Sequence, residues 1–170
     1  MFKINDHVIY GTCGVCKIID INYCNFNDTK RKYYIMKPLY TKNSKIYVPV
    51  ENERKMLKNL LSTEEVHALI KTMPVKKSIW IKQNQQRNAA FRDIIKKGNR
   101  QELVELISTL YLYKTDLAKT GKNLNMSDES IMKEAEKMLY EEFAFVLNIK
   151  LDEVVPYIKK SLIHNKMQSE

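Results

Sequence analysis

The stretch SKIYVPVENERKMLKNLLSTEEV, residues 44–66, contains the change of pattern that decides the fold. Its first part, residues 44–50, is short and rich in Val, Ile and Tyr, which is typical of a β-strand. In its last part Ser62 is followed three residues later by Glu65, which is the spacing of a helix capping box. Residues 51–60 are therefore expected to join a β part to a helical part.

Three segments upstream of this stretch also have the composition of strands. They are HVIYG (residues 7–11), VCKIIDINY (residues 15–23) and KYYIMKPLY (residues 32–40), and turn-prone residues separate them. Four or five short strands with such connections predict a small antiparallel barrel. The edge backbone of such a barrel can accept a strand of another protein.

Helical spacing continues downstream of Ser62, and Pro74 ends the first helix. Four more helices are expected, over residues 79–97, 102–119, 128–148 and from about 151 onward. Gly98 suits a left-handed cap at the end of the second helix, and Asn99 suits the N-cap of the third. Ser127 is expected to begin the fourth helix.

We therefore predict an α+β protein with two domains: a small antiparallel β barrel of the Tudor/SH3-like kind at residues 1–56 and an all-α bundle at residues 57–170. No apolar run approaches the ~20 residues that a membrane-spanning helix needs. The opening residues lack the apolar core of a signal peptide, and three cysteines do not support a secreted disulfide framework. We expect a cytoplasmic protein without membrane contact.

The net charge of +9 is concentrated in one part of the chain. Residues 57–100 carry 10 Lys and Arg against 3 Asp and Glu, whereas residues 101–170 carry 9 against 12. A clustered cationic excess is typical of proteins that bind phosphate backbones. A well-solvated lysine surface is the alternative.

The only tryptophan, Trp80, lies at the start of the basic stretch KKSIWIKQNQQRNAAFRDIIKK, residues 76–97. If the predicted helix is continuous, Trp80 shares a face with Arg87 and Phe91, which favours a place in the core. A tryptophan in the first turn can instead project beyond the bundle, where an aromatic wedge among cations suits an unstacked base step. The cations next to it are Lys76, Lys77 and Lys82.

Motifs for catalysis or metal binding are sparse. Cys13 and Cys16 have the C-x-x-C spacing and Cys24 is near, but a second pair of zinc ligands is missing. Packing in a strand is the preferred interpretation, with metal or redox sensing as the alternative. Phosphate loops, paired histidines and a nucleophile elbow are also missing from the sequence, so we expect a protein that is not an enzyme and needs no cofactor.

Two sets of side chains on the predicted helices have a structural interpretation. Core or half-buried packing is expected for the helical tyrosines, which are Tyr111, Tyr113 and Tyr140. A solvated face is expected for the glutamates of the fourth helix, which are Glu134, Glu136, Glu141 and Glu142.

The whole chain resembles the CarD/CdnL family of bacterial RNA polymerase-binding transcription regulators. The resemblance rests on FKINDHVIYGTCGVCKIIDI (residues 2–21), YVPVEN (47–52), the single tryptophan before a basic helix, KKGNRQELVELISTLY (96–111) and SDESIMKEAEKMLYEEFAFVLN (127–148). It implies a Tudor-like barrel that binds the β subunit of RNA polymerase through one strand and its edge. It also implies a helical domain that meets promoter DNA at the upstream fork of the bubble, where Trp80 wedges into the minor groove and favours the open complex.

Departures from the family pattern shape the expected sites. WIKQN has only Lys82 where relatives have two arginines, so Arg87 and Arg92 join Trp80, Lys76, Lys77 and Lys82 as expected DNA contacts. Relatives also have an arginine at the position of Tyr47. The polymerase contact is therefore expected to use Asn25, Phe26, Lys45 and Tyr47. Asn5 replaces a glycine, and asparagine tolerates the positive φ that this turn requires.

We expect a monomer that associates with the nucleoid and binds promoter DNA largely independently of sequence. Two other functions fit the sequence. One is an adaptor of the transcription machinery that does not touch DNA, and the other is a regulator that senses metal or redox state through Cys13, Cys16 and Cys24.

Overall fold

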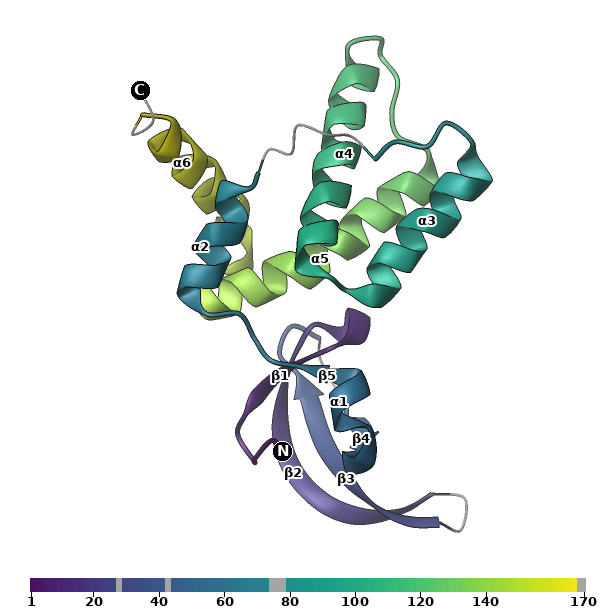
Figure 1. Ribbon diagram of the computed structural model, residues 1–170, viewed down its shortest axis with the longest axis vertical. Helices are drawn as coiled ribbons and strands as arrows, with labels where there is room; N and C mark the ends of the chain where they lie inside the picture. Colours follow the sequence, from purple (N-terminus) through teal and green to yellow (C-terminus); the bar gives the residue numbers. More distant parts are fainter. Residues whose placement is uncertain (27–28, 42–43, 74–78, 168–170) are drawn as a thin grey trace. The chain divides into compact units, whose positions relative to one another are not determined.

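The computed structural model describes residues 1–26, 29–41, 44–73 and 79–167 (Figure 1). The chain divides into two compact units, Met1–Leu61 and Ser62–Glu170, and each has its own core. Within the described ranges, no helix combines the length and apolar composition that crossing a membrane requires.

The first unit is a five-stranded antiparallel sheet, as predicted. Its strands are β1 (His7–Tyr10), β2 (Val15–Phe26), β3 (Thr29–Pro38), β4 (Ile46–Pro49) and β5 (Leu57–Lys58), in the order β4-β3-β2-β1-β5. β2 and β3 are longer than predicted, because their pairing continues to Phe26 and Thr29. The result is the long curved hairpin in Figure 1.

The core of this unit gathers the inward-facing side chains of all five strands. It contains Val8, Cys16, Ile18, Tyr34, Met36, Val48 and Leu57. Burial, together with a hydrogen bond from the Tyr34 hydroxyl to Glu53, raises the pKa of Tyr34 to about 12. The predicted positive φ of Asn5 is confirmed at 75°.

The boundary between the units lies later than the sequence indicates. We expected it after residue 56, but Leu57 and Lys58 pair with β1 and so complete the sheet. A short helix, α1 (Glu53–Met56), precedes this strand. The first unit therefore extends to Leu61.

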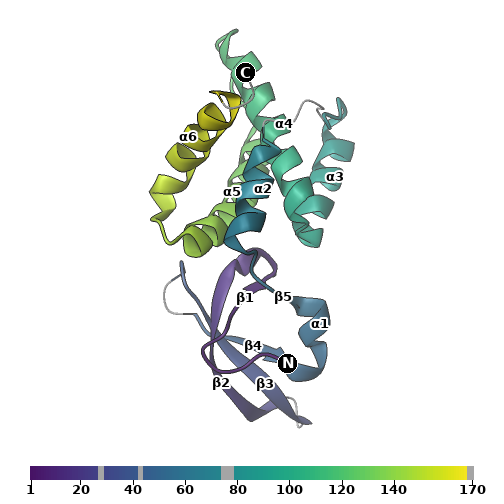
Figure 2. The ribbon, with the colours of Figure 1, turned by 60° about the vertical axis from the view of Figure 1, so that its left-hand side comes forward.

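The second unit is helical, as predicted. Its helices are α2 (Thr63–Lys71), α3 (Asn84–Lys97), α4 (Arg100–Ala118), α5 (Met126–Leu147) and α6 (Val154–Met167). α5 is central and packs against the other four. Figure 2 shows α2 lying beside α6, where the His67 ring is 2.7 Å from the Tyr157 hydroxyl.

Local signals set most helix ends. Ser62 and Glu65 form the predicted capping box, and the Asn99 side chain accepts from the Glu102 N–H. Gly98 ends α3 in the left-handed conformation at φ 57° and ψ 36°. The predicted start of the fourth helix at Ser127 is wrong by two residues, because Asn125 is the N-cap of α5 and the helix begins at Met126.

The start of α3 also differs from the prediction. We expected a helix from residue 79, but α3 begins at Asn84, so Trp80 lies in an irregular segment before it. The carbonyls of Ile81 and Lys82 accept hydrogen bonds from the Arg87 guanidinium. This side chain therefore stabilises a non-helical path between residues 79 and 83.

The prediction that four glutamates form a solvated face of α5 is wrong for two of them. Glu141 and Glu142 are each 2% exposed, because α5 packs against four helices. Glu142 forms an ion pair with Arg100 at 2.8 Å. One oxygen of Glu141, Oε2, is buried without a hydrogen-bond partner.

Glu141→Gln is expected to stabilise the helical unit at neutral pH. Burial raises the pKa of Glu141 above its ordinary value of 4.5. The folded state therefore holds the proton more tightly than the unfolded chain, and stability falls as the pH rises above that value. Removing the ionisable group should raise the free energy of unfolding by about 1 kcal/mol at pH 7.5, with little gain at pH 4.

Denaturant unfolding at the two pH values checks this prediction. Glu129→Gln is the matched control, because Glu129 lies on the same helix in an exposed pair with Lys133. Its effect should stay within about 0.5 kcal/mol at both pH values. A Glu141→Gln protein that is less stable than the parent at pH 7.5 would contradict the prediction.

Candidate functional sites

Trp80 is half-buried at the surface of the helical unit. Its ring stacks on Tyr113 of α4, with centroids 3.6 Å apart and an interplanar angle of 27°. Phe91 of α3, which is fully buried, meets the indole edge-on at 6.4 Å. The guanidinium carbon of Arg87 lies 4.1 Å from the ring centroid. The indole is thus held by aromatic and cationic contacts while part of it stays exposed.

Arg87 is buried, at 3% exposure, and its donors are fully used inside the protein. An arginine side chain has five N–H donors. Two bonds go to the Asp128 carboxylate, from Nε at 3.2 Å and from Nη2 at 2.7 Å. The others go to the carbonyls of Ile81 at 2.9 Å and Lys82 at 3.3 Å, and to Oδ1 of Asn84. No donor is left over for a ligand.

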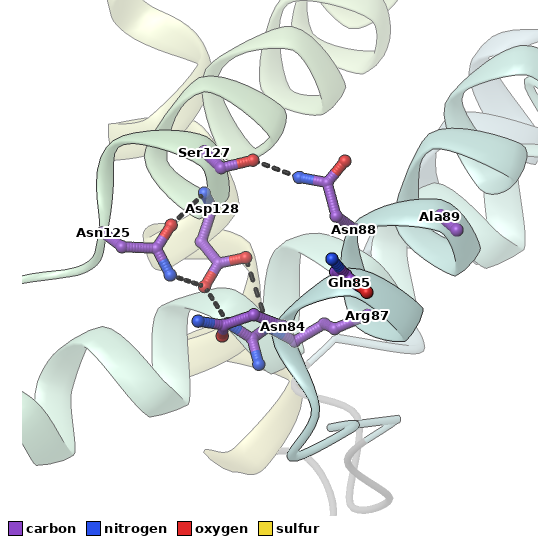
Figure 3. A pocket seen from close by; sticks show the side chains of 8 residues that line it. All are labelled: Asn84, Gln85, Arg87, Asn88, Ala89, Asn125, Ser127 and Asp128. Atoms are coloured by element: carbon purple, nitrogen blue, oxygen red, sulfur yellow. Dashed lines mark hydrogen bonds and ion pairs between the residues drawn. The ribbon is translucent and has the colours of Figure 1, made fainter.

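The Arg87–Asp128 pair lies beside a hollow of about 400 Å³ between the first turns of α3 and α5, and most of the residues that line it are of polar type (Figure 3). Asp128 points from α5 toward Asn84 and Arg87, and Asn125 holds it from the other side. The Asn125 side chain donates to Asp128 Oδ2 at 2.7 Å and accepts from the Asp128 N–H at 2.9 Å. The side-chain amide of Asn88 on α3 donates a hydrogen bond to the Ser127 hydroxyl on α5.

A second hollow, of about 370 Å³, opens next to the indole. Trp80 and Tyr113 form its aromatic part, and Lys82, Lys122 and Asn123 form part of its polar rim. Lys82 and Lys122 are exposed, and none of the described carboxylates is ion-paired with either. The surface around Trp80 therefore offers a flat ring and two available cations.

The sheet of the first unit carries an aromatic cluster, which we define as Phe26, Tyr33 and Tyr47. Phe26 meets Tyr33 at 5.1 Å and Tyr47 at 5.5 Å between ring centroids, both edge-on. Phe26 is 45% exposed and Tyr47 is 41% exposed. The cluster lies across the β2–β3 hairpin and β4, and β4 forms one edge of the sheet. Such exposed rings next to an open edge are typical of a protein-binding surface.

Comparison with protein families decides what the two units are. A model described as CarD-like/TRCF RID domain matches residues 2–60, and one described as CarD, C-terminal domain matches residues 65–159. The chain belongs to the CarD family. Its first unit is a Tudor-like domain of the kind that interacts with the RNA polymerase β subunit, and the protein is an RNA polymerase-interacting transcription factor. A comparison with curated proteins finds no match.

The structure places the predicted DNA contacts of this CarD-family chain in three different settings. Lys76 and Lys77 lie outside the described residues. Lys82 is exposed at the rim of the hollow, and Arg92 is exposed on α3, where its Nε donates to Asn88 at 3.2 Å. Arg87 is not placed as we expected, because its buried guanidinium is fully hydrogen-bonded within the protein and has no donor left for a phosphate.

The predicted polymerase contacts are also divided. Phe26 and Tyr47 come together in the aromatic cluster. Asn25 is exposed but neighbours Phe26 along β2, so its side chain lies on the opposite face of the hairpin. Lys45 is exposed immediately before β4.

The cysteines favour the packing interpretation. Cys16 is fully buried in the core of the sheet, and Cys13 and Cys24 are half-buried free thiols. Among the residues whose positions the structure gives, no three His, Cys, Asp or Glu side chains gather as a metal site would need.

Several important side chains were missed or misjudged from the sequence. Tyr113 was expected only to pack, yet it stacks on Trp80. Tyr111, expected in or near the core, is 56% exposed. The sequence predicts Asp128 only as a first-turn residue of the fourth helix and predicts no role for Lys122, because they lie 41 residues from Arg87 and 40 residues from Lys82. The N-cap spacing of Asn125 and Asp128 was the one local signal that could have indicated a fixed carboxylate.

Proposed function

We propose that this CarD-family protein binds the polymerase β subunit through its aromatic cluster and contacts promoter DNA at the upstream fork of the bubble through Trp80, which favours the open complex. One observation carries the DNA part of the proposal: a half-buried indole, held by Tyr113 and Arg87, lies at the rim of a hollow with two lysines that pair with none of the described carboxylates.

Lys82 and Lys122 suit the DNA backbone. Phosphate contacts are electrostatic and independent of sequence, so each lysine that neutralises a phosphate adds to the salt dependence of binding. Both ammonium groups are exposed and free of carboxylate partners within the described residues. Arg92, also exposed, can add a further contact from α3.

Trp80 suits a wedge more than a stacking platform. Tyr113 and Arg87 already lie against the plane of the indole, which leaves less of that plane for an unpaired base. Apolar side chains that enter the minor groove insert between base steps and partly unstack them. A wedge of this kind stabilises an unwound edge, because closing the duplex would require its removal.

Stabilising the unwound edge shifts the promoter equilibrium. A factor that binds the open complex more tightly than the closed complex raises the open fraction by the ratio of the two affinities. A difference of about 1.4 kcal/mol corresponds to a tenfold shift.

Binding to forked DNA tests the proposal. Wild-type protein should bind a duplex with an unpaired fork more tightly than a plain duplex of the same length, and Trp80→Ala should abolish that preference, with a loss of about tenfold for the fork. Tyr111→Ala is the matched control, because Tyr111 is a more exposed aromatic residue of the same unit. It should bind both DNAs as the wild type does.

A salt titration of the same complexes tests the lysines. Lys82→Ala and Lys122→Ala should each weaken binding to any sequence and reduce the slope of log affinity against log salt by about one. Wild-type protein that binds neither DNA at low salt would refute the DNA contact and favour an adaptor without DNA binding.

A further inference from the structure

We propose that Arg87 is a positioning residue, which is held by Asp128 and fixes the orientation of the Trp80 indole. The consequence for DNA rests on the proposed function, but the orientation itself can be measured without DNA.

The segment around Trp80 has no regular structure of its own. Residues 79–83 precede α3 and form no helix, and Gln83 caps α3 without a side-chain hydrogen bond. The Ile79 N–H donates to Thr109 at 3.2 Å, and the carbonyls of Ile81 and Lys82 accept from Arg87. Arg87 therefore binds the backbone that carries Trp80 and also lies against its ring.

Asp128 makes Arg87 a rigid support. Its carboxylate accepts two bonds from the guanidinium, and Asn125 fixes it at the start of α5. Arg87 and Asp128 are 3% and 2% exposed, so water competes little for these bonds. The chain of contacts runs from the first turn of α5 through Asp128 and Arg87 to Trp80.

Only an arginine can make this set of contacts. Its planar fork reaches a carboxylate, two carbonyls and an amide oxygen at once, while a lysine has three donors around a single point. Lysine at position 87 would keep the charge and could keep a bond to Asp128. It would leave the carbonyls of Ile81 and Lys82 without their hydrogen bonds from residue 87. It would also remove the planar cation that lies against the Trp80 ring.

Fluorescence can test this inference, because Trp80 is the only tryptophan of the chain. In Arg87→Lys, acrylamide should quench Trp80 roughly twofold more strongly and its anisotropy should fall, since a less constrained indole moves and meets solvent more freely. Asp128→Asn, which keeps the side-chain shape and removes the charge, should change both signals in the same direction. Affinity for forked DNA should fall roughly tenfold in Arg87→Lys.

Arg100→Lys is the matched control for a purely structural role. Arg100 also makes a two-point contact with a buried carboxylate of α5, donating to Glu142 at 3.0 and 2.8 Å. It should lose stability in thermal unfolding, while Trp80 quenching and anisotropy stay at wild-type values. All spectra are taken well below the unfolding midpoint of each variant.

The outcomes separate this inference from the proposed function. The positioning role is overturned if folded Arg87→Lys and Asp128→Asn keep the Trp80 fluorescence of the wild type. It is also overturned if Arg100→Lys changes Trp80 quenching and anisotropy as much as they do. Altered Trp80 signals in the first two variants alone would support it. If wild-type protein then shows no preference for forked DNA, the positioning role stands and the proposed function fails.

Discussion

Replacing Asp128 with alanine is expected to lower the free energy of unfolding of the helical unit by about 3–5 kcal/mol. The change removes the carboxylate partner of Arg87, whose side chain is only 3% exposed in the wild-type protein. A buried charge that loses its partner keeps the cost of desolvation but loses the attraction that offset it. Asp128→Ala also removes the acceptor for the Asn125 side chain at the start of α5. Denaturant unfolding followed by circular dichroism measures the loss.

Two further variants show whether the unpaired charge is the cause. Asp116→Ala breaks an ion pair with Lys119 in which both side chains are about 70% exposed, at 69% and 71%, and should cost less than about 0.5 kcal/mol. The double variant Arg87→Met with Asp128→Leu removes both charges and should cost clearly less than Asp128→Ala alone. A loss below about 1 kcal/mol in Asp128→Ala would mean that the pair does not hold the first turns of α3 and α5 together.

The double variant Phe26→Ala with Tyr47→Ala is expected to weaken binding to the polymerase β subunit by about 2–3 kcal/mol, or roughly 30- to 150-fold. These two rings are exposed and contact one another next to the open edge of β4. Aromatic side chains that are already packed lose little entropy when a partner covers them, which makes them frequent binding hot spots. The contact should be only weakly dependent on salt, because it is apolar. Titration of the isolated β subunit measures it.

Tyr23→Ala is the matched control for this surface. Tyr23 is 61% exposed on β2, and its odd spacing from Phe26 places it on the other face of the hairpin. Its removal should leave the affinity within about twofold of wild type, as expected outside a hot spot. If Tyr23→Ala weakens binding as much as the double variant does, the polymerase contact lies on the opposite face of the hairpin.

The sequence predicts the parts of the fold that depend on near neighbours. Ser62 with Glu65, Asn99 with Glu102 and the left-handed Gly98 are interactions within four residues, and each lies where its pattern indicates. The strands follow from their composition for the same reason, although their ends do not. β2 and β3 continue through residues that look turn-prone, because each strand supplies the other with hydrogen bonds.

The site around Trp80 depends on distant partners and could not be predicted in the same way. Arg87 meets Asp128 41 residues away, and no local pattern marks either residue as half of a buried pair. The sequence therefore predicts a phosphate contact for Arg87, a basic residue near a tryptophan. Glu141 was misjudged for a related reason: α5 has helices on several sides, so a glutamate on it can be buried even though the sequence predicts a polar face.

Promoter opening by RNA polymerase, measured with wild-type protein and with Trp80→Ala, tests the central claim most directly. The variant should bind the β subunit as the wild type does, since Trp80 lies in the other unit. Wild-type protein should raise the open fraction, and Trp80→Ala should lose most of that effect, about tenfold in the opening equilibrium. If folded, polymerase-bound Trp80→Ala promotes opening as strongly as the wild type, the indole does not support the unwound edge.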